Sequence, residues 1–304
     1  MTPKLRGAQF KSVAMAGFTL NDTIAKYAYE SMNMGQVMVM RGLFATLFVV
    51  LLAWHRGAFR SFSFALHPLL WLRVLCEVGG TVTFLLPLSR LPLANVSAVM
   101  QALPLAVTMG AALVFAETVG WRRWLAIAVG FTGVMIIVRP GFEGFNAWAL
   151  LVLACVGFCA VRDLATKRIP SEIPTLFIST MTAAGNTICG FFLIQPLGGW
   201  TPPGMADTAL LAFAAVLLLI GYQFIIMAMR TGEISYIAPF RYTALLWAIL
   251  MGFVVFGDVP DMAMIAGATI IVGSGLYTLY RERVVGRARP AAESTGPAMG
   301  PDGL

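Results

Sequence analysis

Five ionisable side chains lie inside long apolar stretches of this sequence, namely Asp22, Lys26, Arg41, Glu77 and Arg241. Charges in an apolar environment are costly, so they are retained mainly where they bind a solute, relay protons or pair with one another. Asp22 and Lys26 are four residues apart, which places both on one face of a helix. The residue types therefore indicate ion pairing or binding of a polar solute.

Asp22 and Arg41 are each about seven residues from the same end of two consecutive apolar segments, which corresponds to similar depths at about 1.5 Å per residue. One interpretation is a fixed ion pair that locks the two helices together. The other is that Asp22, Lys26 and Arg41 line a cavity and open or close an outer gate.

Glu77 is about ten residues into its segment, close to the middle. An unpaired carboxylate at that depth is expected to hold a proton, because the loss of water disfavours its charged form. Glu77 is therefore a candidate for proton coupling, and a neutral glutamate that only packs is the alternative. Arg241 follows Pro239, which can kink a helix. It is expected to face a cavity from the inner half, with snorkelling to the surface as the alternative.

The excess of basic over acidic groups in these segments, three against two, favours a solute that carries an anionic group. Aromatic and amide side chains are expected to accompany them, and the further candidates here are Trp71, Asn186, Tyr222 and Gln223. The predicted substrate-binding or gating residues are Asp22, Lys26, Arg41, Glu77, Gln101, Arg241, Tyr242 and Trp247.

Catalysis is not expected. The two histidines, His55 and His67, fall in a predicted loop, and the sequence contains neither a GxSxG nor an HExxH motif. The four cysteines lie within predicted helices and have no set of further ligands for a metal. We therefore expect no catalytic residues, no metal and no cofactor, and we interpret the chain as a protein that is not an enzyme.

The elements that would position these residues are membrane helices. The 304 residues are 59% hydrophobic and only 12% charged, with a mean hydropathy of +0.82, which excludes an ordinary soluble domain. A membrane-spanning helix needs about 20 apolar residues. Such stretches occur at about 10–29, 34–54, 68–88, 92–115, 121–138, 146–166, 173–194, 208–228, 234–256 and 262–280. The sequence thus predicts an all-α membrane protein with ten transmembrane helices.

The distribution of lysine and arginine predicts the orientation. Sixteen of these residues, with Lys11, Arg73 and Arg162 counted among them, fall on the side of the N-terminus, and only Arg90 and Arg139 fall on the other. Both termini are therefore expected in the cytoplasm. The net charge of +7 becomes a topology signal, and no nucleic-acid partner is expected. Residues 285–304 are predicted to form a disordered cytoplasmic tail.

A shift of 141 residues brings Phe115 and Glu117 onto Phe256 and Asp258, and the helix after the first pair onto the last helix. Five helices per half would place the halves in opposite orientations, as two inverted five-helix repeats over 1–140 and 141–284. Inverted repeats are usual in secondary transporters, with the substrate site between the halves. Small residues in 121–138 and 262–280 (Ala126, Gly130, Gly133, Gly267, Gly273 and Gly275) are expected to let helix backbones approach closely.

Phe115-Ala-Glu117, which leads into WRRWLAIAVGFTGVMIIVRP, resembles the EamA branch of the drug/metabolite transporter superfamily over residues 8–282. LNDTIAKYAYE at 20–30, Arg41 and APFRYTALLWAILMGFVVFGDVPD at 238–261 are similar to its S-adenosylmethionine and riboflavin uptake carriers. Asp258 stands where the family usually has glutamate. The resemblance implies a bacterial inner-membrane carrier, without ATP hydrolysis, for a small ring-bearing metabolite with a polar or anionic group. Its partners would be this solute, the lipid bilayer and, as a candidate coupling ion, the proton. Export of amino acids or related metabolites is the alternative.

Overall fold

The computed structural model describes residues 3–55, 64, 66–114, 120–139, 147–170, 172–231 and 238–284. Over these ranges every regular element is a helix, which confirms the all-α prediction. The predicted tail 285–304 and the Phe115–Glu117 motif lie outside the described residues.

The helices follow the predicted stretches closely. The first half contains α1 (Pro3–Ala28), α2 (Met34–His55), α3 (Pro68–Leu88), α4 (Leu93–Met100), α5 (Leu103–Val114) and α6 (Trp121–Val138). The second half contains α7 (Ala147–Lys167), α8 (Thr175–Ile194), α9 (Met205–Thr231), η2 (Ala238–Tyr242), α11 (Thr243–Phe256) and α12 (Met262–Val284).

Nine spans among the described residues are long and apolar enough to cross a membrane, when α4 with α5 and η2 with α11 are each taken as one span. The tenth is α1, which has 26 residues and a length of about 39 Å, more than the roughly 30 Å of hydrocarbon. It is less apolar because it carries Lys11, Asp22 and Lys26. The chain is therefore a multi-pass membrane protein.

Two of the ten spans contain a break. The predicted continuous helix at 92–115 is wrong at Gln101–Ala102, where α4 ends and α5 begins. Pro104 explains the break, because its ring lacks an N–H and clashes with the carbonyl of residue 100. The other break lies where η2, which contains Pro239, meets α11. The shift of 141 residues brings Gln101 onto Tyr242, so both breaks occupy the same place in the repeat.

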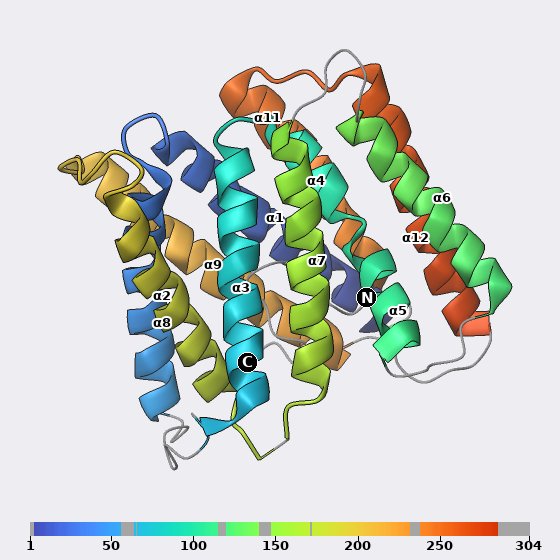
Figure 1. The fold of residues 1–304 in the computed structure, drawn as a ribbon, viewed down its shortest axis with the longest axis horizontal. Helices are drawn as coiled ribbons and strands as arrows, with labels where there is room; N and C mark the ends of the chain where they lie inside the picture. The colour runs from blue at the N-terminus through green and yellow to red at the C-terminus, as the bar shows by residue number, and fades with distance from the viewer. Residues whose placement is uncertain are drawn as a thin grey trace.

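The packing of the helices follows the repeat. The main contacts join α1 with α9, α2 with α8, α3 with α7 and α6 with α12. Exchanging the halves converts the α1–α9 pair into the α7–α3 pair and maps the other two pairs onto themselves. Figure 1 shows α2 and α8 side by side at one end of the molecule, with α6 and α12 at the other. The ten helices thus form two inverted five-helix repeats.

Small residues bring α6 and α12 together. A Cβ atom on Gly133 would lie 2.8 Å from the carbonyl oxygen of Gly267, and one on Gly267 would lie 2.6 Å from the carbonyl oxygen of Gly133. These two glycines confirm the predicted close approach of the helix backbones. For Gly273 the prediction is wrong, because a Cβ atom there would meet nothing within 4 Å.

Gly133→Ala is therefore expected to lower the stability of the protein by about 1–3 kcal/mol, the usual cost of overpacking. Gly273→Ala is the matched control. It is expected to be neutral or slightly stabilising, because alanine favours a helix interior by about 0.5–1 kcal/mol over glycine. Thermal unfolding of both variants in detergent measures the difference. Equal melting temperatures would show that the Gly133–Gly267 approach does not hold α6 against α12.

Candidate functional site

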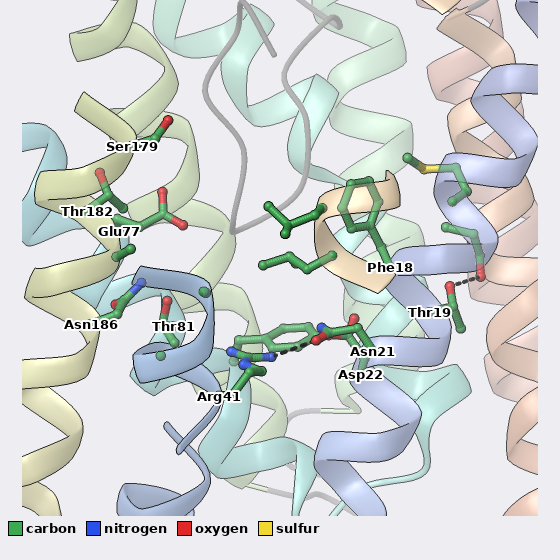
Figure 2. Close-up of a pocket in the computed structure, with 18 of the residues that line it drawn as sticks. Phe18, Thr19, Asn21, Asp22, Arg41, Glu77, Thr81, Ser179, Thr182 and Asn186 are labelled. Atoms are coloured by element: carbon green, nitrogen blue, oxygen red, sulfur yellow. Dashed lines mark hydrogen bonds between the residues drawn. The ribbon is translucent and has the colours of Figure 1, made fainter. Parts of the chain in front are cut away.

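A large cavity lies between the two halves. Its walls come from α1, α2, α3 and α4 of the first half and from α8, α9, η2 and α11 of the second. With its open part included, it contains about 1990 Å³ of space outside protein atoms. Figure 2 shows Glu77, Thr81, Thr182 and Asn186 on one side of the cavity and Phe18, with Thr19, Asn21 and Asp22 of the same helix, across from them.

Five of the eight predicted residues line this cavity: Asp22, Arg41, Glu77, Gln101 and Arg241. Arg241, which is buried on η2, therefore points inward and does not snorkel to the surface. Two residues that the sequence named as accompanying side chains, Asn186 and Gln223, line the cavity as well. The side chain of Tyr222 lies outside the described residues.

The expected Asp22–Arg41 pair is indirect. Arg41 Nη1 donates to Asn21 Oδ1 at 3.5 Å, and Asn21 Nδ2 donates to Asp22 Oδ1 at 3.0 Å. Asn21 is buried and stands between the two charges (Figure 2). The prediction of a direct ion pair is therefore wrong in this conformation, because the preceding residue on α1 occupies the position between the charged groups.

Lys26 lies outside the cavity wall and joins the two halves instead. Its Nζ donates to the carbonyl oxygen of Leu91 at 2.6 Å, lies 3.4 Å from Asp258 Oδ2 and sits 4.7 Å from the centre of the Phe256 ring. The expectation that Lys26 lines the cavity is wrong. The ammonium group instead ties α1 to the segments before α4 and after α11, at the predicted outer face.

A second link closes the same face. Gln36 Nε2 donates to the carbonyl oxygen of Thr201, and the Thr201 N–H donates back to Gln36 Oε1 at 3.0 Å. Cavity-lining side chains towards this face, such as Met38, Phe84 and Leu93, are buried, whereas Val49 and Leu52 towards the opposite face are partly exposed. The cavity is therefore closed towards the predicted outer face.

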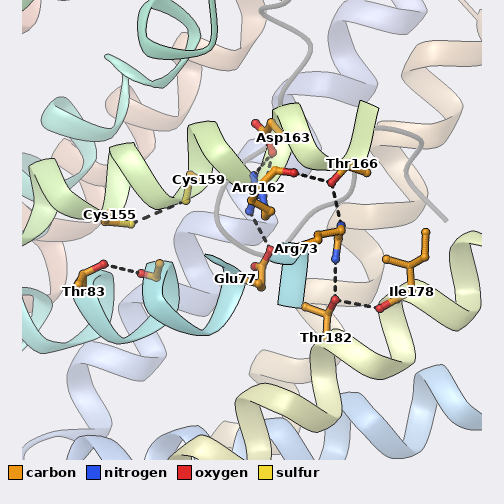
Figure 3. A network of polar contacts seen from close by, with 11 residues as sticks. Arg73, Glu77, Thr83, Cys155, Cys159, Arg162, Asp163, Thr166, Ile178 and Thr182 are labelled. Carbon is orange, nitrogen blue, oxygen red and sulfur yellow. Dashed lines mark hydrogen bonds and ion pairs between the residues drawn. The ribbon is translucent and has the colours of Figure 1, made fainter. Parts of the chain in front are cut away.

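Behind Glu77 lies a buried ionic network (Figure 3). Arg162 Nη1 lies 3.1 Å from Glu77 Oε2, and Arg162 Nη2 lies 2.6 Å from Asp163 Oδ1, with the arginine side chain 0% exposed. The premise that Glu77 is unpaired is wrong. Arg162, which was counted with the basic residues on the side of the N-terminus, lies inside α7, five residues before its last residue, and faces α3.

Arg73 extends the network to α8. Its Nε donates to Thr166 Oγ1 at 2.9 Å and its Nη1 donates to Thr182 Oγ1 at 2.6 Å. Arg73 and Lys11 are both buried and line the cavity, although both were expected among the basic residues on the side of the N-terminus.

A signal for the network was present in the sequence. The same shift of 141 residues brings Asp22 onto Asp163 and Lys26 onto Lys167, so each repeat carries an Asp-x-x-x-Lys motif. Asp22 lies at the depth of the cavity, which indicates that Asp163 and its neighbour Arg162 also lie within the helix bundle. Comparing the repeats over their whole length would have identified both residues.

Tyr242 and Trp247 pack between helices and do not line the cavity. Tyr242 is buried with Ala238 and Leu279, against α12. Trp247 packs with residues of α1 and α9, including Met15 and Ile225. Tyr242 was predicted because it neighbours Arg241 and Trp247 because it is aromatic, but both side chains lie on other faces of their helices.

The ionisable residues that line the cavity comprise four basic groups and two acidic ones: Lys11, Arg41, Arg73 and Arg241, with Asp22 and Glu77. The formal charge of the wall is therefore +2. This excess agrees in sign with the one expected from sequence, although it comes partly from different residues.

The profile of the EamA-like transporter family matches residues 5–139, which is the first predicted repeat. A riboflavin transporter of Vibrio cholerae is 30% identical over 276 residues, covering 88% of this chain and 91% of the relative. The chain belongs to the EamA-like transporter family. An S-adenosylmethionine uptake transporter of Rickettsia prowazekii is 24% identical, covering 92% of this chain and 94% of the relative.

More distant matches agree with this membership. A pseudopaline exporter of Pseudomonas aeruginosa is 22% identical, covering 88% of this chain and 93% of the relative. One crystal structure with 16% sequence identity superposes with a TM-score of 0.62, covering 92% of this chain and 99% of the other. That likeness concerns the fold alone. The EamA-like chain described here is thus a multi-pass membrane transporter.

Proposed function

We propose that this chain is a bacterial inner-membrane carrier that takes up a small ring-bearing metabolite of the riboflavin or S-adenosylmethionine type by alternating access. The observation that carries the proposal is the cavity between the inverted repeats, closed at one face and lined by charged groups from both halves. A site between the repeats that can open to either face is the arrangement by which secondary transporters work.

The proposal places both termini in the cytoplasm, because the Lys and Arg residues lie predominantly on that side of the predicted topology. The face closed by Lys26 and Gln36 is then the periplasmic one, and the conformation is inward-facing. We also propose that each repeat is a structural unit, 1–140 and 141–284. The match of the family profile to 5–139 and the exchange symmetry of the helix pairs support this division.

Growth of an auxotroph tests the direction of transport. A bacterial strain that can neither synthesise riboflavin nor import it should grow on low external riboflavin when it expresses this chain. A strain that carries the empty vector should not grow. Growth only at high riboflavin, together with faster loss of preloaded metabolite from the cells, would contradict uptake. It would favour export, the second candidate function, which the 22% identical match to an exporter supports.

Arg41 is proposed to hold the polar or anionic part of the substrate, because it lines the cavity and its hydrogen bond to Asn21 is long, at 3.5 Å. Arg41→Ala is expected to reduce uptake into proteoliposomes at least tenfold, since a hydrogen bond from a charged group contributes about 1.5–3 kcal/mol. Asp22→Asn should have a similar effect. Arg90→Ala is the control, because Arg90 stacks on Trp148 outside this cavity. Wild-type uptake by both cavity variants would refute this role.

Protons are the proposed coupling ion, with Glu77 as their candidate carrier. Glu77→Gln is then expected to retain exchange of substrate across the membrane while losing accumulation driven by a pH gradient. Proteoliposomes assayed with and without an imposed gradient measure both properties. Gradient-driven accumulation that persists in Glu77→Gln would show that coupling does not run through Glu77.

A further inference from the structure

The polar wall of the cavity is built from two helices that run in the same direction. Glu77 and Thr81 are four residues apart on α3, and Thr182 and Asn186 are four apart on α8, so each pair shares a helix face. The two helices are in contact. Figure 2 shows Glu77 beside Thr182 and Asn186 beside Thr81. These four residues are named the polar ladder below, and all four line the cavity.

Two acceptor oxygens of the polar ladder have no hydrogen-bond partner. They are Glu77 Oε1, on a side chain that is 1% exposed, and Asn186 Oδ1. The Thr182 hydroxyl is already used, because it accepts from Arg73 and donates to the carbonyl oxygen of Ile178 at 2.8 Å. A buried acceptor without a donor lowers stability by about 1–3 kcal/mol. A solute that brings a donor to this wall would relieve that cost.

The charges around the polar ladder restrict the donor to a neutral group. Glu77 Oε2 is held by Arg162, and Arg73 also lies close enough to act on Glu77 electrostatically. Arg241 in turn interacts with Arg162 and Asp163. Three arginines thus surround two carboxylates, and the cluster has a formal charge of +1. An ammonium or sulfonium group would enter a region that repels it, whereas a neutral N–H group would not.

The other side of the cavity carries an apolar patch beside Thr19, Asn21 and Asp22 of α1 and Gln223 of α9. Its side chains come from α1, α9 and α11 and include Met15, Phe18, Leu218, Leu219, Ala244 and Ala248. Figure 2 places Phe18 across the cavity from the polar ladder. A flat molecule with one polar edge and one apolar body would match both walls at once.

We infer that the polar ladder is a recognition subsite in which one of its two open acceptors, Glu77 Oε1 or Asn186 Oδ1, accepts the hydrogen bond of a neutral ring N–H group of the substrate. The substrate class is therefore an uncharged or anionic heteroaromatic compound with an imide-type or amide-type edge, and not a cation. The inference rests on the proposed function and selects between its two substrate types. A flavin, whose ring carries an N–H between two carbonyl groups, fits the subsite, and the sulfonium end of S-adenosylmethionine does not.

The test compares riboflavin with its N3-methyl derivative, which lacks this N–H group. Both are used to compete against labelled riboflavin for uptake by wild-type protein in proteoliposomes. Riboflavin should compete at least about tenfold better than the N3-methyl compound, because the methyl group leaves a buried acceptor unpaired. S-adenosylmethionine, a cation, should compete at least tenfold more weakly than riboflavin.

Two substitutions assign the discrimination to the polar ladder. At least one of Glu77→Met and Asn186→Leu should reduce the preference for riboflavin over the N3-methyl compound to about threefold or less, and the variant that does so identifies the acceptor. Phe192→Leu on α8 is the control, since Phe192 is 71% exposed and faces away from the cavity. It should retain the full preference. Because Glu77→Met can affect folding, Asn186→Leu provides an independent measurement, and the melting temperature is recorded for each variant.

The outcomes separate this inference from the proposed function. If wild-type protein takes up riboflavin but the N3-methyl compound competes as well as riboflavin does, the proposed subsite is wrong and the proposed carrier function stands. The same holds if both ladder variants keep the full preference, or if S-adenosylmethionine competes better than riboflavin. If wild-type protein transports neither metabolite, the proposed function fails and the inference fails with it.

Discussion

Arg162→Leu is expected to be the most destabilising single substitution in the interior, with a loss of about 3–5 kcal/mol. Arg162 is 0% exposed and holds both Glu77 and Asp163, at 3.1 and 2.6 Å. Removing the arginine leaves two carboxylates buried without their shared partner, and breaking a buried ion pair from one side typically has this cost. The measurement is thermal unfolding of detergent-purified protein, together with the yield of monodisperse material.

A combined variant separates loss of charge balance from loss of packing. Replacing the whole triad with apolar residues, as Glu77→Met, Arg162→Leu and Asp163→Leu together, should recover most of the lost stability, because no uncompensated charge remains. Arg162→Lys should fall between the two, since lysine keeps the charge but cannot form the same forked contacts. An Arg162→Leu variant that melts like the wild type would contradict the structure of this network.

Lys26→Ala is expected to have the largest effect on conformation. Lys26 joins the halves at the predicted outer face through Leu91 and Asp258. A hydrogen bond from a charged group contributes about 1.5–3 kcal/mol, so its loss should shift the balance between inward-facing and outward-facing states at least tenfold. Uptake of substrate should fall accordingly, and the outer end of the cavity should open.

Labelling of a single cysteine measures this shift. Met38 lies at the closed end of the cavity and is 2% exposed. In a chain whose four native cysteines are replaced, Met38→Cys should react faster with a membrane-impermeant maleimide added from outside once Lys26→Ala is present. The charge-exchanged pair Lys26→Glu with Asp258→Lys should restore slow labelling in part.

The chain offers a matched control for the Lys26 experiment. Arg139 Nη2 and Asp261 Oδ2 form an ion pair of 2.5 Å between the same two halves at the same face, but their side chains are 33% and 54% exposed. Exposed pairs contribute only about 0–1 kcal/mol. Arg139→Ala should therefore leave labelling unchanged. Equal effects of Arg139→Ala and Lys26→Ala on the labelling rate would show that Lys26 has no specific role in holding the outer face closed.

The spans were predictable from sequence because length and apolar composition decide whether a helix can cross a bilayer. The predicted stretches 34–54, 68–88 and 121–138 agree with α2, α3 and α6 to within a residue at each end. The break at Gln101–Ala102 was missed because Pro104 was not weighed. The equivalent break beside Pro239 was expected because that proline was weighed.

The depth of the site residues in the membrane was predictable from the sequence, but the residues that they contact were not. Asp22, Arg41 and Arg241 were identified by their charge within apolar segments, and all three line the cavity. Partners depend on helix rotation and packing, which single-sequence periodicity does not specify. Lys26 and Asp258 are 232 residues apart, and Arg162 contacts Glu77 across 85. Contacts at such separations become visible only when the inverted repeats are superposed or the fold is known.

Counterflow in proteoliposomes tests the central claim most directly, because it requires one site that opens alternately to both sides. Purified protein would be reconstituted into vesicles loaded with unlabelled riboflavin, and labelled riboflavin would be added outside. We predict a transient accumulation of label above its equilibrium level, which is absent from protein-free vesicles and reduced at least tenfold by Arg41→Ala. No accumulation of either labelled riboflavin or labelled S-adenosylmethionine, from protein that is folded and correctly inserted, would contradict the account.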